Sequence, residues 1–315
     1  MAELKAFLQE NLSLNFVKDL GSRGGGCISS SRHFSTDIGD IFVKTYELEK
    51  GKVMFTGEYE SLKAIKETNT VTVPKPIKIL ENENTHEYVF VMEFINMGSL
   101  SKFQSKLGED LARLHLHNRQ LLDKAKKSET QVGKAEKCEV VEQFGFHVNT
   151  SCGMIPQDNT WNKDWIEFYT RQKLQQQIDL LLKEYQDREL QALWSDLQLN
   201  IDKFFKGIDP QPSLLHGDLW SGNAAETREG PVIYDAASFY GHDEYDLAIA
   251  GMFGGFNSQF YKAYHNLIPV AKGFEERHIL YTLFHYLNHW NHFGTGYRSQ
   301  SISYMKKLIN YAKKS

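Results

Sequence analysis

The sequence predicts a two-lobed α/β fold of the α+β kind, with an antiparallel sheet and one helix in the first lobe and mainly helices in the second. Up to about residue 95, short runs rich in β-branched and aromatic residues alternate with Gly, Pro and Asn, which is typical of strands. Beyond that point, longer stretches carry apolar residues at helical spacing. The change falls in the segment 96–99 (NMGS), so the predicted lobes are residues 1–97 and 98–315.

The composition excludes several classes of protein. A chain of 315 residues with 41% hydrophobic side chains is long enough for one large domain or two smaller ones. The net charge of -4 argues against nucleic-acid binding, for which a basic surface is usual. No apolar stretch approaches the roughly 20 residues that a membrane helix needs. Three cysteines without a C-x-x-C pair favour a reducing, cytoplasmic location over a secreted fold.

The first lobe is expected to begin with a short amphipathic helix within 1–16. Leucines recur there every four residues, and the stretch has neither the continuous apolar region nor the small-residue cleavage site of a signal peptide. Three later runs are predicted to be strands: 41–46 (IFVKTY), 71–73 (VTV) and 88–94 (YVFVMEF). A helix is expected over 54–66, because Phe55, Leu62 and Ile65 recur at helical spacing.

The second lobe is expected to be built from long helices. Apolar residues keep a helical period over 107–122, 165–194 and 279–292. A charged stretch without apolar periodicity, 123–139, separates the first two and is predicted to be a surface loop.

A glycine-rich segment, 21–28 (GSRGGGCI), lies between two strand-like runs. Glycines let the backbone approach phosphate oxygens and direct N–H groups at them, because no Cβ is in the way. By itself such a segment is more often a hairpin turn, and it matches neither the Walker pattern nor a dinucleotide fingerprint. Eighteen positions after Gly26, Lys44 places a charge inside an apolar strand pattern. Lys44 is either an edge-strand residue that reaches solvent or a phosphate ligand.

Glu58 favours the second interpretation of Lys44. It lies four residues before Leu62 and seven before Ile65, so it shares the inward face of the predicted helix, whereas Glu60 faces away. A buried carboxylate requires a partner, and Lys44 on the adjacent strand is the candidate. A glycine-rich loop, a strand lysine and an inward glutamate form the nucleotide-positioning part of a kinase-like site.

The strongest pattern is H-x-D-x-x-x-x-N at 216–223 (HGDLWSGN), followed by an apolar run that ends at Asp235. This spacing is typical of phosphotransfer sites. Asp218 can accept the proton of an attacking hydroxyl. The amide oxygen of Asn223 and the carboxylate of Asp235 are ligands that Mg²⁺ prefers. A purely structural turn does not account for all three residues together with the strand lysine and the helix glutamate.

The chain resembles the fructosamine/ketosamine 3-kinase family, in the small-molecule branch of the protein-kinase-like superfamily, over nearly its whole length. The segments that carry the resemblance are GGGCIS (24–29), IFVK (41–44), TNTVTVPKPIKIL (68–80), KLGEDLARLHLHN (106–118), FGFH (144–147), HGDLWSGN (216–223), YDAASFYGH (234–242), AIAGMFGGF (248–256) and HYLNHWNHFGTGYRS (285–299). The combination of HGDLWSGN with SFYGH is highly specific. Within the family, the chain is closer to the ketosamine-3-kinase branch than to the fructosamine branch.

The resemblance implies ATP-dependent phosphorylation of the third-carbon hydroxyl of ketosamines, the adducts that sugars form with amines such as protein lysines. The expected substrates are glycated proteins or small ketosamines, with ribulosamine and psicosamine favoured and fructosamine a further candidate. In the family the phosphorylated product is unstable and frees the lysine, so the expected role is protein deglycation.

The implied site follows from the positions that match the family's motifs. ATP is expected to lie between an N-terminal ATP-binding lobe and a C-terminal catalytic lobe, with Mg²⁺ held by Asn223 and Asp235. Lys44 and Glu58 are assigned to phosphate positioning and Asp218 to base catalysis. Further nucleotide contacts are predicted at Gly24, Gly25, Gly26, Cys27, Ile28, Met92, Glu93, Phe94 and Ile95, and substrate contacts at Trp220 and His216.

Two alternatives stay open from the residues alone: a kinase for another small acceptor, of the aminoglycoside or choline type, and a non-catalytic pseudokinase. A peptide-binding platform is not expected, because only eleven positions separate Asp235 from Asp246 and no A-P-E element is present. Trp220 either offers an aromatic face to a sugar or is a core residue of its loop. Ala236 stands where the family usually has proline, a departure that removes no ligand.

Two further features carry weaker hypotheses. His285, His289 and His292 share one helix face at a spacing that suits zinc, but without accompanying acidic or cysteine ligands they are expected to be structural or substrate-lining. Cys27 lies in the glycine-rich loop, where backbone N–H groups favour a thiolate. A monomer is expected, with the hypothesis that oxidation of Cys27 or a disulfide-linked dimer through it blocks ATP entry.

Overall fold

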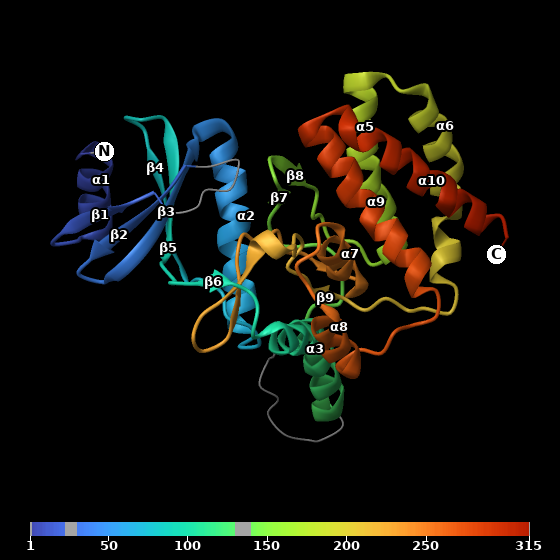
Figure 1. Cartoon of the computed structure of the whole chain (residues 1–315), viewed down its shortest axis with the longest axis horizontal. Helices are drawn as coiled ribbons and strands as arrows, with labels where there is room; N and C mark the ends of the chain where they lie inside the picture. Colours follow the sequence, from blue (N-terminus) through green and yellow to red (C-terminus); the bar gives the residue numbers. More distant parts are fainter. Residues whose placement is uncertain (1, 23–29, 130–139, 315) are drawn as a thin grey trace.

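A computed structural model describes residues 2–22, 30–129 and 140–314 of the chain. Figure 1 shows the main β-sheet, with its helices, beside a larger region made mostly of helices. The predicted fold class is confirmed, because an antiparallel sheet with one long helix is followed by a mainly helical part. The lobe boundary at residue 97 stays a prediction.

The main sheet has five antiparallel strands in the order β1-β2-β3-β5-β4. Their bounds are Val17–Gly21 (β1), Ser30–Thr36 (β2), Gly39–Glu47 (β3), Pro76–Asn82 (β4) and Glu87–Glu93 (β5). The strands predicted over 41–46 and 88–94 are confirmed as the neighbours β3 and β5. Lys44 lies between Ser31 on β2 and Phe90 on β5, so it is not an edge-strand residue.

Each face of the sheet is covered by one helix, because alternate side chains of a strand point to opposite faces. The two helices are α1 (Ala2–Leu12), which confirms the expected N-terminal helix, and α2 (Leu48–Glu67). Val89 and Val91 are completely buried in one cluster with Leu8 of α1. On the opposite face, Phe90 packs against Phe55 of α2. Burial of each such side chain stabilises the fold by roughly 1.5–3 kcal/mol.

The long helix α2 begins earlier than predicted and approaches the C-terminal region closely. Gly57 makes this approach possible, because a Cβ there would lie 2.7 Å from the Cα of Thr150. One turn further, the Ser61 hydroxyl accepts a hydrogen bond from the backbone N–H of Ser238 at 2.9 Å. The helix therefore fixes the position of Glu58 relative to both regions.

The strand predicted over 71–73 is wrong. Val71 and Val73 are buried, but the segment pairs with the C-terminal region instead of the main sheet: the carbonyl of Thr72 accepts a hydrogen bond from the Ile233 N–H at 3.0 Å. Pro74 follows at once and has no N–H to donate to a ladder. This segment therefore links the two regions of the chain.

The C-terminal region is built mainly from helices, and Figure 1 shows α5, α6, α9 and α10 together on the side away from the sheet. The bounds are Gln104–Glu129 (α3), Trp165–Glu167 (α4), Phe168–Leu174 (the π-helix η1), Gln175–Tyr185 (α5), Arg188–Leu197 (α6), Gln198–Phe205 (the 3₁₀ helix η2), Ser221–Asn223 (the 3₁₀ helix η3), Glu244–Met252 (α7), Ser258–Leu267 (α8), Phe274–Phe293 (α9), Thr295–Tyr297 (the 3₁₀ helix η4) and Arg298–Ala312 (α10). The helices predicted over 107–122 and 279–292 are confirmed in α3 and α9. Of the described helices, none is both long and apolar enough to cross a membrane.

The single helix predicted over 165–194 is wrong, because the structure interrupts it twice. Its second turn widens into the π-helix η1, and α5 ends at Tyr185, before Gln186, whose φ of 50° is left-handed. Asp187 then starts α6 by accepting a hydrogen bond from the Leu190 N–H at 3.0 Å. The apolar period continues through this corner, which is why the sequence pattern does not reveal it.

The first part of the loop predicted over 123–139 is helical instead. α3 continues to Glu129, so the first part of this charged stretch is the last part of a helix, and most of residues 123–127 are exposed. The earlier turns of α3 are packed in the core, and adding further residues to a helix that has already formed costs little free energy. Residues 130–139 lie outside the described residues.

Three small sheets lie between the main sheet and the helices α5, α6, α9 and α10 (Figure 1). They join β6 (Gly98–Ser99) with β10 (Ala224–Glu226) and β11 (Pro231–Ile233), β9 (Ser213–Leu214) with β12 (Tyr240–Gly241), and β7 (Thr150–Cys152) with β8 (Ile155–Gln157). The segment 216–223 follows β9 and leads directly into β10, so strands hold both of its ends.

A buried ion pair connects three segments of the C-terminal region. Arg277 of α9 is completely buried and donates two hydrogen bonds of 2.7 Å to the carboxylate of Glu244, at the start of α7. It also donates to the carbonyls of Phe204 and Lys272. A guanidinium group can be buried here because these acceptors replace water.

We expect Arg277→Met to lower the free energy of unfolding by about 3–5 kcal/mol, because it leaves the Glu244 carboxylate buried without its partner. The matched control is Arg113→Met on α3, which removes an exposed pair with Glu109 and should change the stability far less, because water screens exposed pairs. Denaturant unfolding measures both values. Equal losses in the two variants would contradict the role of the buried pair.

Candidate active site

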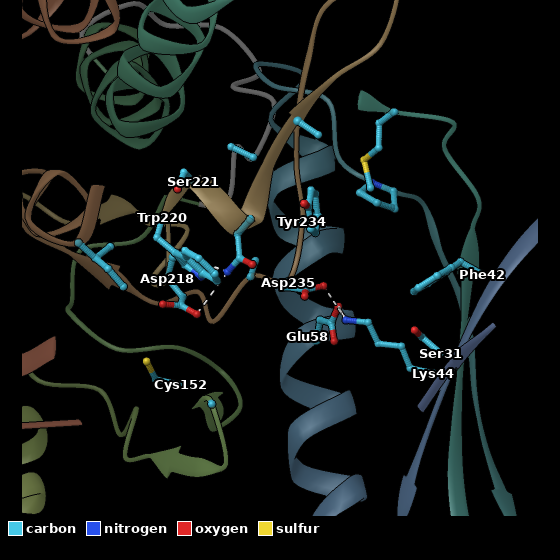
Figure 2. A pocket seen from close by; sticks show the side chains of 18 of the residues that line it. Ser31, Phe42, Lys44, Glu58, Cys152, Asp218, Trp220, Ser221, Tyr234 and Asp235 are labelled. Carbon is cyan, nitrogen blue, oxygen red and sulfur yellow. Dashed lines mark hydrogen bonds and ion pairs between the residues drawn. The ribbon is translucent and has the colours of Figure 1, made fainter. Parts of the chain in front are cut away.

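A cleft of about 1030 Å³ is lined by both regions of the protein, and the predicted site residues that the structure describes meet there, with the exception of His216 (Figure 2). The sheet region supplies Lys44, Glu58, Met92, Glu93, Phe94 and Ile95, and the helical region supplies Asp218, Trp220, Asn223 and Asp235. The predicted glycine-rich contacts at 24–28, including Cys27, lie outside the described residues.

Lys44 connects the two regions across the cleft. Its Nζ donates hydrogen bonds of 2.6 Å to Glu58 on α2 and to Asp235 after β11. Lys44 is 8% exposed and Glu58 is 9% exposed, as the inward position of Glu58 requires. Although burial alone lowers the pKa of Lys44, the two carboxylates raise it above its usual value. Burial raises the pKa of Glu58 to about 7, even though Lys44 opposes this shift.

The hairpin of β10 and β11 brings Asn223 and Asp235 together. At the open end of this hairpin, the Tyr234 N–H donates a hydrogen bond of 3.1 Å to the Asn223 carbonyl. Asp235 has a φ of 58°, a left-handed conformation that is strained for this residue and recurs at functional sites. The amide nitrogen of Asn223 donates to the backbone and carboxylate oxygens of Asp218, which leaves the amide oxygen for another partner. An amide oxygen beside a carboxylate fits Mg²⁺.

Asp218 lies on the side of Asp235 away from Lys44, as Figure 2 shows. Its carboxylate accepts a hydrogen bond of 3.3 Å from the Asn223 amide. Burial raises the pKa of Asp218 to about 7, and the charge of Asp235 adds to the shift. A carboxyl group that titrates near neutrality can take up and release a proton at physiological pH. Asp218 is therefore suited to proton transfer from an acceptor hydroxyl.

The position of Asp218 depends on Asp246, to which the sequence patterns assign no role. Asp246 is completely buried on α7, and it accepts hydrogen bonds from the backbone N–H groups of His216 at 2.7 Å and Gly217 at 2.8 Å. The ring of His115 on α3 lies 3.1 Å from the same carboxylate. Burial alone raises the pKa of Asp246, but the contacts with His115 and the backbone hold it below its usual value.

His216 and Gly217 shape the loop that carries Asp218. Gly217 has a φ of 84°, and a Cβ there would clash with the carbonyl of Ala237. His216 is completely buried, its Nε2 lies 3.0 Å from the Tyr234 carbonyl, and its Nδ1 accepts from the Asp218 N–H at 3.3 Å. This geometry favours a positioning role for His216 over the predicted contact with substrate.

The segment 92–95 lines the cleft at the position expected for the adenine-binding edge. The Glu93 N–H donates to the Lys75 carbonyl at 2.9 Å, and the Phe94 N–H donates to the Asp40 carbonyl at 3.0 Å. Contacts within the sheet region therefore occupy these two donors. The predicted nucleotide contacts of the segment stay a prediction, and these two N–H groups are not available for them.

Aromatic and histidine side chains line the opposite end of the cleft. Trp220 is 36% exposed and packs edge-to-face against Phe253, with ring centroids 5.7 Å apart. His289, Phe293 and Tyr297 line the same part of the cavity. Trp220 is therefore not a core residue, and its predicted stacking on a sugar stays a prediction.

Together these side chains have the chemistry of phosphoryl transfer. Lys44 can bind phosphate oxygens, and Asn223 and Asp235 can hold the cation that accompanies them. Asp218 can take a proton from an acceptor that enters from the aromatic end. The fold and the cleft place the protein in the class of kinase-like phosphotransferases that act on hydroxyl groups.

Within this class the chain belongs to the fructosamine kinase family, whose model matches residues 1–311, and the predicted resemblance is confirmed. The chain is similar to the ketosamine-3-kinase of Mus musculus, with 51% identity over 308 residues, or 97% of this chain and 99% of the relative. It is 40% identical to the chloroplastic protein-ribulosamine 3-kinase of Arabidopsis thaliana, over 94% of this chain and 84% of the relative. A solved structure described as a "putative fructosamine-3-kinase" of Thermobifida fusca YX-ER1 shares the fold, with a TM-score of 0.79 and 22% identity over 98% of this chain and 99% of the other.

We expect Asp246→Asn to lower the free energy of unfolding by about 1.5–3 kcal/mol, the usual contribution of a hydrogen bond to a charged group. Turnover should fall more than nucleotide affinity, because the loop that carries Asp218 loses its anchor. Denaturant unfolding and a comparison of kcat with nucleotide binding measure the two effects. The control is Asp243→Asn, three residues away, which should stay within about 0.5 kcal/mol of the unsubstituted protein. Equal effects of the two substitutions would contradict the anchoring role.

Proposed function

We propose that the protein is an ATP-dependent ketosamine 3-kinase, which transfers the γ-phosphoryl group of ATP to the hydroxyl on the third carbon of a ketosamine. The observation that carries this proposal is the 51% identity with a relative named ketosamine-3-kinase, over almost the full length of both chains. The cleft supports it, because the five residues assigned to phosphate, cation and proton handling line one cavity: Lys44, Glu58, Asp218, Asn223 and Asp235.

In the proposed complex, ATP lies in the cleft with its adenine against the segment 92–95 and its phosphates toward Lys44. Glu58 holds Lys44 in place through their hydrogen bond of 2.6 Å. Residues 24–28 are proposed to contact the phosphates through backbone N–H groups. The hydrogen bond between Lys44 and Asp235 must open as phosphate enters, because phosphate oxygens compete for the same ammonium group.

Asn223 and Asp235 are proposed to hold Mg²⁺, since they offer the hard oxygen ligands that this ion prefers. When bound there, the ion neutralises negative charge on the phosphates. The left-handed backbone of Asp235 fixes the direction of its carboxylate relative to the hairpin. Asn223 serves two partners at once, because its amide nitrogen orients Asp218 while its amide oxygen faces the cation.

Asp218 is proposed to accept the proton of the third-carbon hydroxyl as that oxygen attacks the γ-phosphorus. A pKa of about 7 lets this carboxylate be ionised before the transfer and keep the proton after it. Trp220 is proposed to stack on the sugar. The bond from phosphorus to the bridging oxygen of ADP breaks as the new bond forms. Phosphorylated adducts on proteins would then break down, so the proposed role is deglycation of proteins and of small ketosamines.

The rival functions have less support. An acceptor of the aminoglycoside or choline type is not favoured, because the relatives are named for ketosamine and ribulosamine. A pseudokinase is expected to lack at least one residue of the catalytic set, and this chain has all five. Ribulosamine is proposed as the preferred sugar adduct. A cytoplasmic monomer is also proposed, and the dimer linked through Cys27 stays a hypothesis about a residue outside the described ones.

The test is a substrate panel with labelled ATP and Mg²⁺, containing ribulosamine and fructosamine derivatives of a lysine peptide, an aminoglycoside and choline. We expect transfer to the ketosamines, ribulosamine first, and none to the other two. Asp218→Asn should lower turnover by roughly 10²–10⁴-fold while nucleotide binding persists. Transfer to the aminoglycoside or choline alone, or full turnover by Asp218→Asn, would overturn the proposal.

The pH dependence of the reaction rate should reflect the titration of Asp218. Burial raises the pKa of Asp218 from its usual acidic range to about 7, so kcat/KM for the ketosamine should fall as the pH drops through about 7. The loss follows because a protonated carboxyl group cannot accept the hydroxyl proton. The fall is measured from rates at saturating MgATP over a range of pH values. The control is the same measurement with an acceptor that lacks the amine. If the pH at which the rate falls differed between the two acceptors, the titrating group would belong to the substrate and not to Asp218.

A further inference from the structure

Beside Asp218 lie two side chains that the proposed mechanism does not use: Cys152, which lines the cleft, and His285, which is buried behind it. Cys152 ends β7 and is 2% exposed, and His285 on α9 is 0% exposed. Figure 2 shows Cys152 on a chain segment that passes near Asp218. One ligand-type atom from each of Cys152, Asp218 and His285 lies within 4.8 Å of the other two. Three elements far apart in the sequence therefore meet at one point.

The ring of His285 is the unusual member of this cluster. Both of its nitrogens are buried and have no hydrogen-bond partner among the described residues. The same holds for the side-chain oxygen of Asn288, whose amide nitrogen donates to the sulfur of Cys152 at 3.2 Å. Buried polar atoms normally have partners, so an unpartnered imidazole next to a thiol and a carboxyl group points to a ligand.

The chemistry of the three groups selects one kind of ligand. Thiolate, imidazole and carboxylate together are typical of zinc sites, whereas Mg²⁺ prefers oxygen ligands alone. Bonds of about 2.0–2.3 Å in a tetrahedral site place ligand atoms roughly 3.5 Å apart, so small side-chain rotations complete the site. Burial raises the pKa of Cys152, which the charge of Lys173 opposes, and a coordinated metal ion removes the thiol proton outright.

We propose that Cys152, His285 and Asp218 form a binding site for zinc, and that zinc bound there inhibits the kinase. The ion takes the carboxylate of Asp218, which then cannot accept the proton of the acceptor hydroxyl. Binding of zinc is independent of the proposed function, whereas the inhibition rests on it. The neighbours His289 and His292 are not ligands in this arrangement, because the described ligand-type atoms that lie within 4.8 Å of one another are those of Cys152, Asp218 and His285. The Nε2 atom of His292 also already accepts a hydrogen bond from the Met154 N–H.

Cobalt absorption tests the binding on the full chain without nucleotide. The starting protein carries Cys27→Ser and Cys138→Ser, so that Cys152 is the one cysteine left of three. We expect a thiolate-to-cobalt charge-transfer band that zinc displaces. Cys152→Ser should abolish this band, and His285→Asn should raise the cobalt dissociation constant at least about tenfold. Absence of the band, or its persistence in Cys152→Ser, would overturn the site.

The matched control on α9 is His292→Asn. Both nitrogens of His292 already have partners, since Nδ1 bonds to the Asn288 carbonyl and Nε2 accepts from the Met154 N–H at 2.8 Å. This variant should keep the cobalt band, and loss of the band would count against the assigned ligands. Thermal unfolding shows which variants are folded. If His285→Asn is not, Asp218→Asn takes its place, because it removes a ligand charge with little change of shape.

A zinc titration of ketosamine kinase activity at saturating MgATP tests the inhibition, with each variant compared with its own zinc-free rate. We expect zinc to inhibit the starting protein and a zinc-selective chelator to restore the rate. Cys152→Ser should raise the half-inhibitory zinc concentration at least about tenfold. Equal zinc sensitivity would overturn the inhibition. Absence of ketosamine kinase activity in zinc-free buffer would contradict the proposed function, while the cobalt result would still decide the site.

Discussion

The charge cluster of Lys44, Glu58 and Asp235 is the constraint on which the rest of the site depends. A lysine inside a paired strand can be buried only with opposite charges beside it. Here the two carboxylates come from α2 and from the segment after β11. Loss of the ammonium group would leave the buried carboxylate of Glu58 without its partner, next to the partly exposed carboxylate of Asp235. Breaking a buried ion pair such as that of Lys44 and Glu58 typically costs about 3–5 kcal/mol. The bond between Lys44 and Glu58 therefore fixes the sheet relative to the long helix, and the bond from Lys44 to Asp235 joins both to the hairpin of β10 and β11 until phosphate displaces it in the proposed complex.

Two aspartates next to this cluster show how partners decide the role of a carboxyl group. Asp246 is completely buried, yet the contact with His115 and two backbone N–H groups hold its pKa below the usual value. Burial raises the pKa of Asp218 to about 7 and the charge of Asp235 adds to the shift, because its one side-chain donor, Asn223, opposes the shift only in part. The number of donors, more than depth of burial, separates an anchoring carboxylate from one that can exchange a proton. The anchor also supplies the rigidity that the proton acceptor needs.

Local spacing predicts much of the site, and tertiary contacts decide the rest. Glu58 could be predicted because a helix of fixed period places it beside apolar neighbours, and Asp218 belongs to a pattern of eight consecutive residues. Asp246 had only a weak signal, an acid at the start of an apolar run, because its two donors come from another loop. The corner at Gln186 could not be predicted, because the apolar residues keep their helical spacing on both sides of it. Its left-handed backbone depends on the packing of α5 and α6 and not on the residue type.

The proposed zinc site and the proposed base, Asp218, share one physical origin. A carboxyl group that titrates near neutrality requires a surrounding with little water and few hydrogen-bond donors. In such a surrounding, some neighbouring polar groups are left without hydrogen-bond partners. His285 and the oxygen of Asn288 are these unsatisfied groups, and the buried thiol of Cys152 lies among them. The histidine spacing on α9 could not identify the ligands, because the sulfur and the carboxylate reach His285 from other elements. The same desolvation that suits Asp218 to the proposed proton transfer therefore suits it to the proposed capture by zinc.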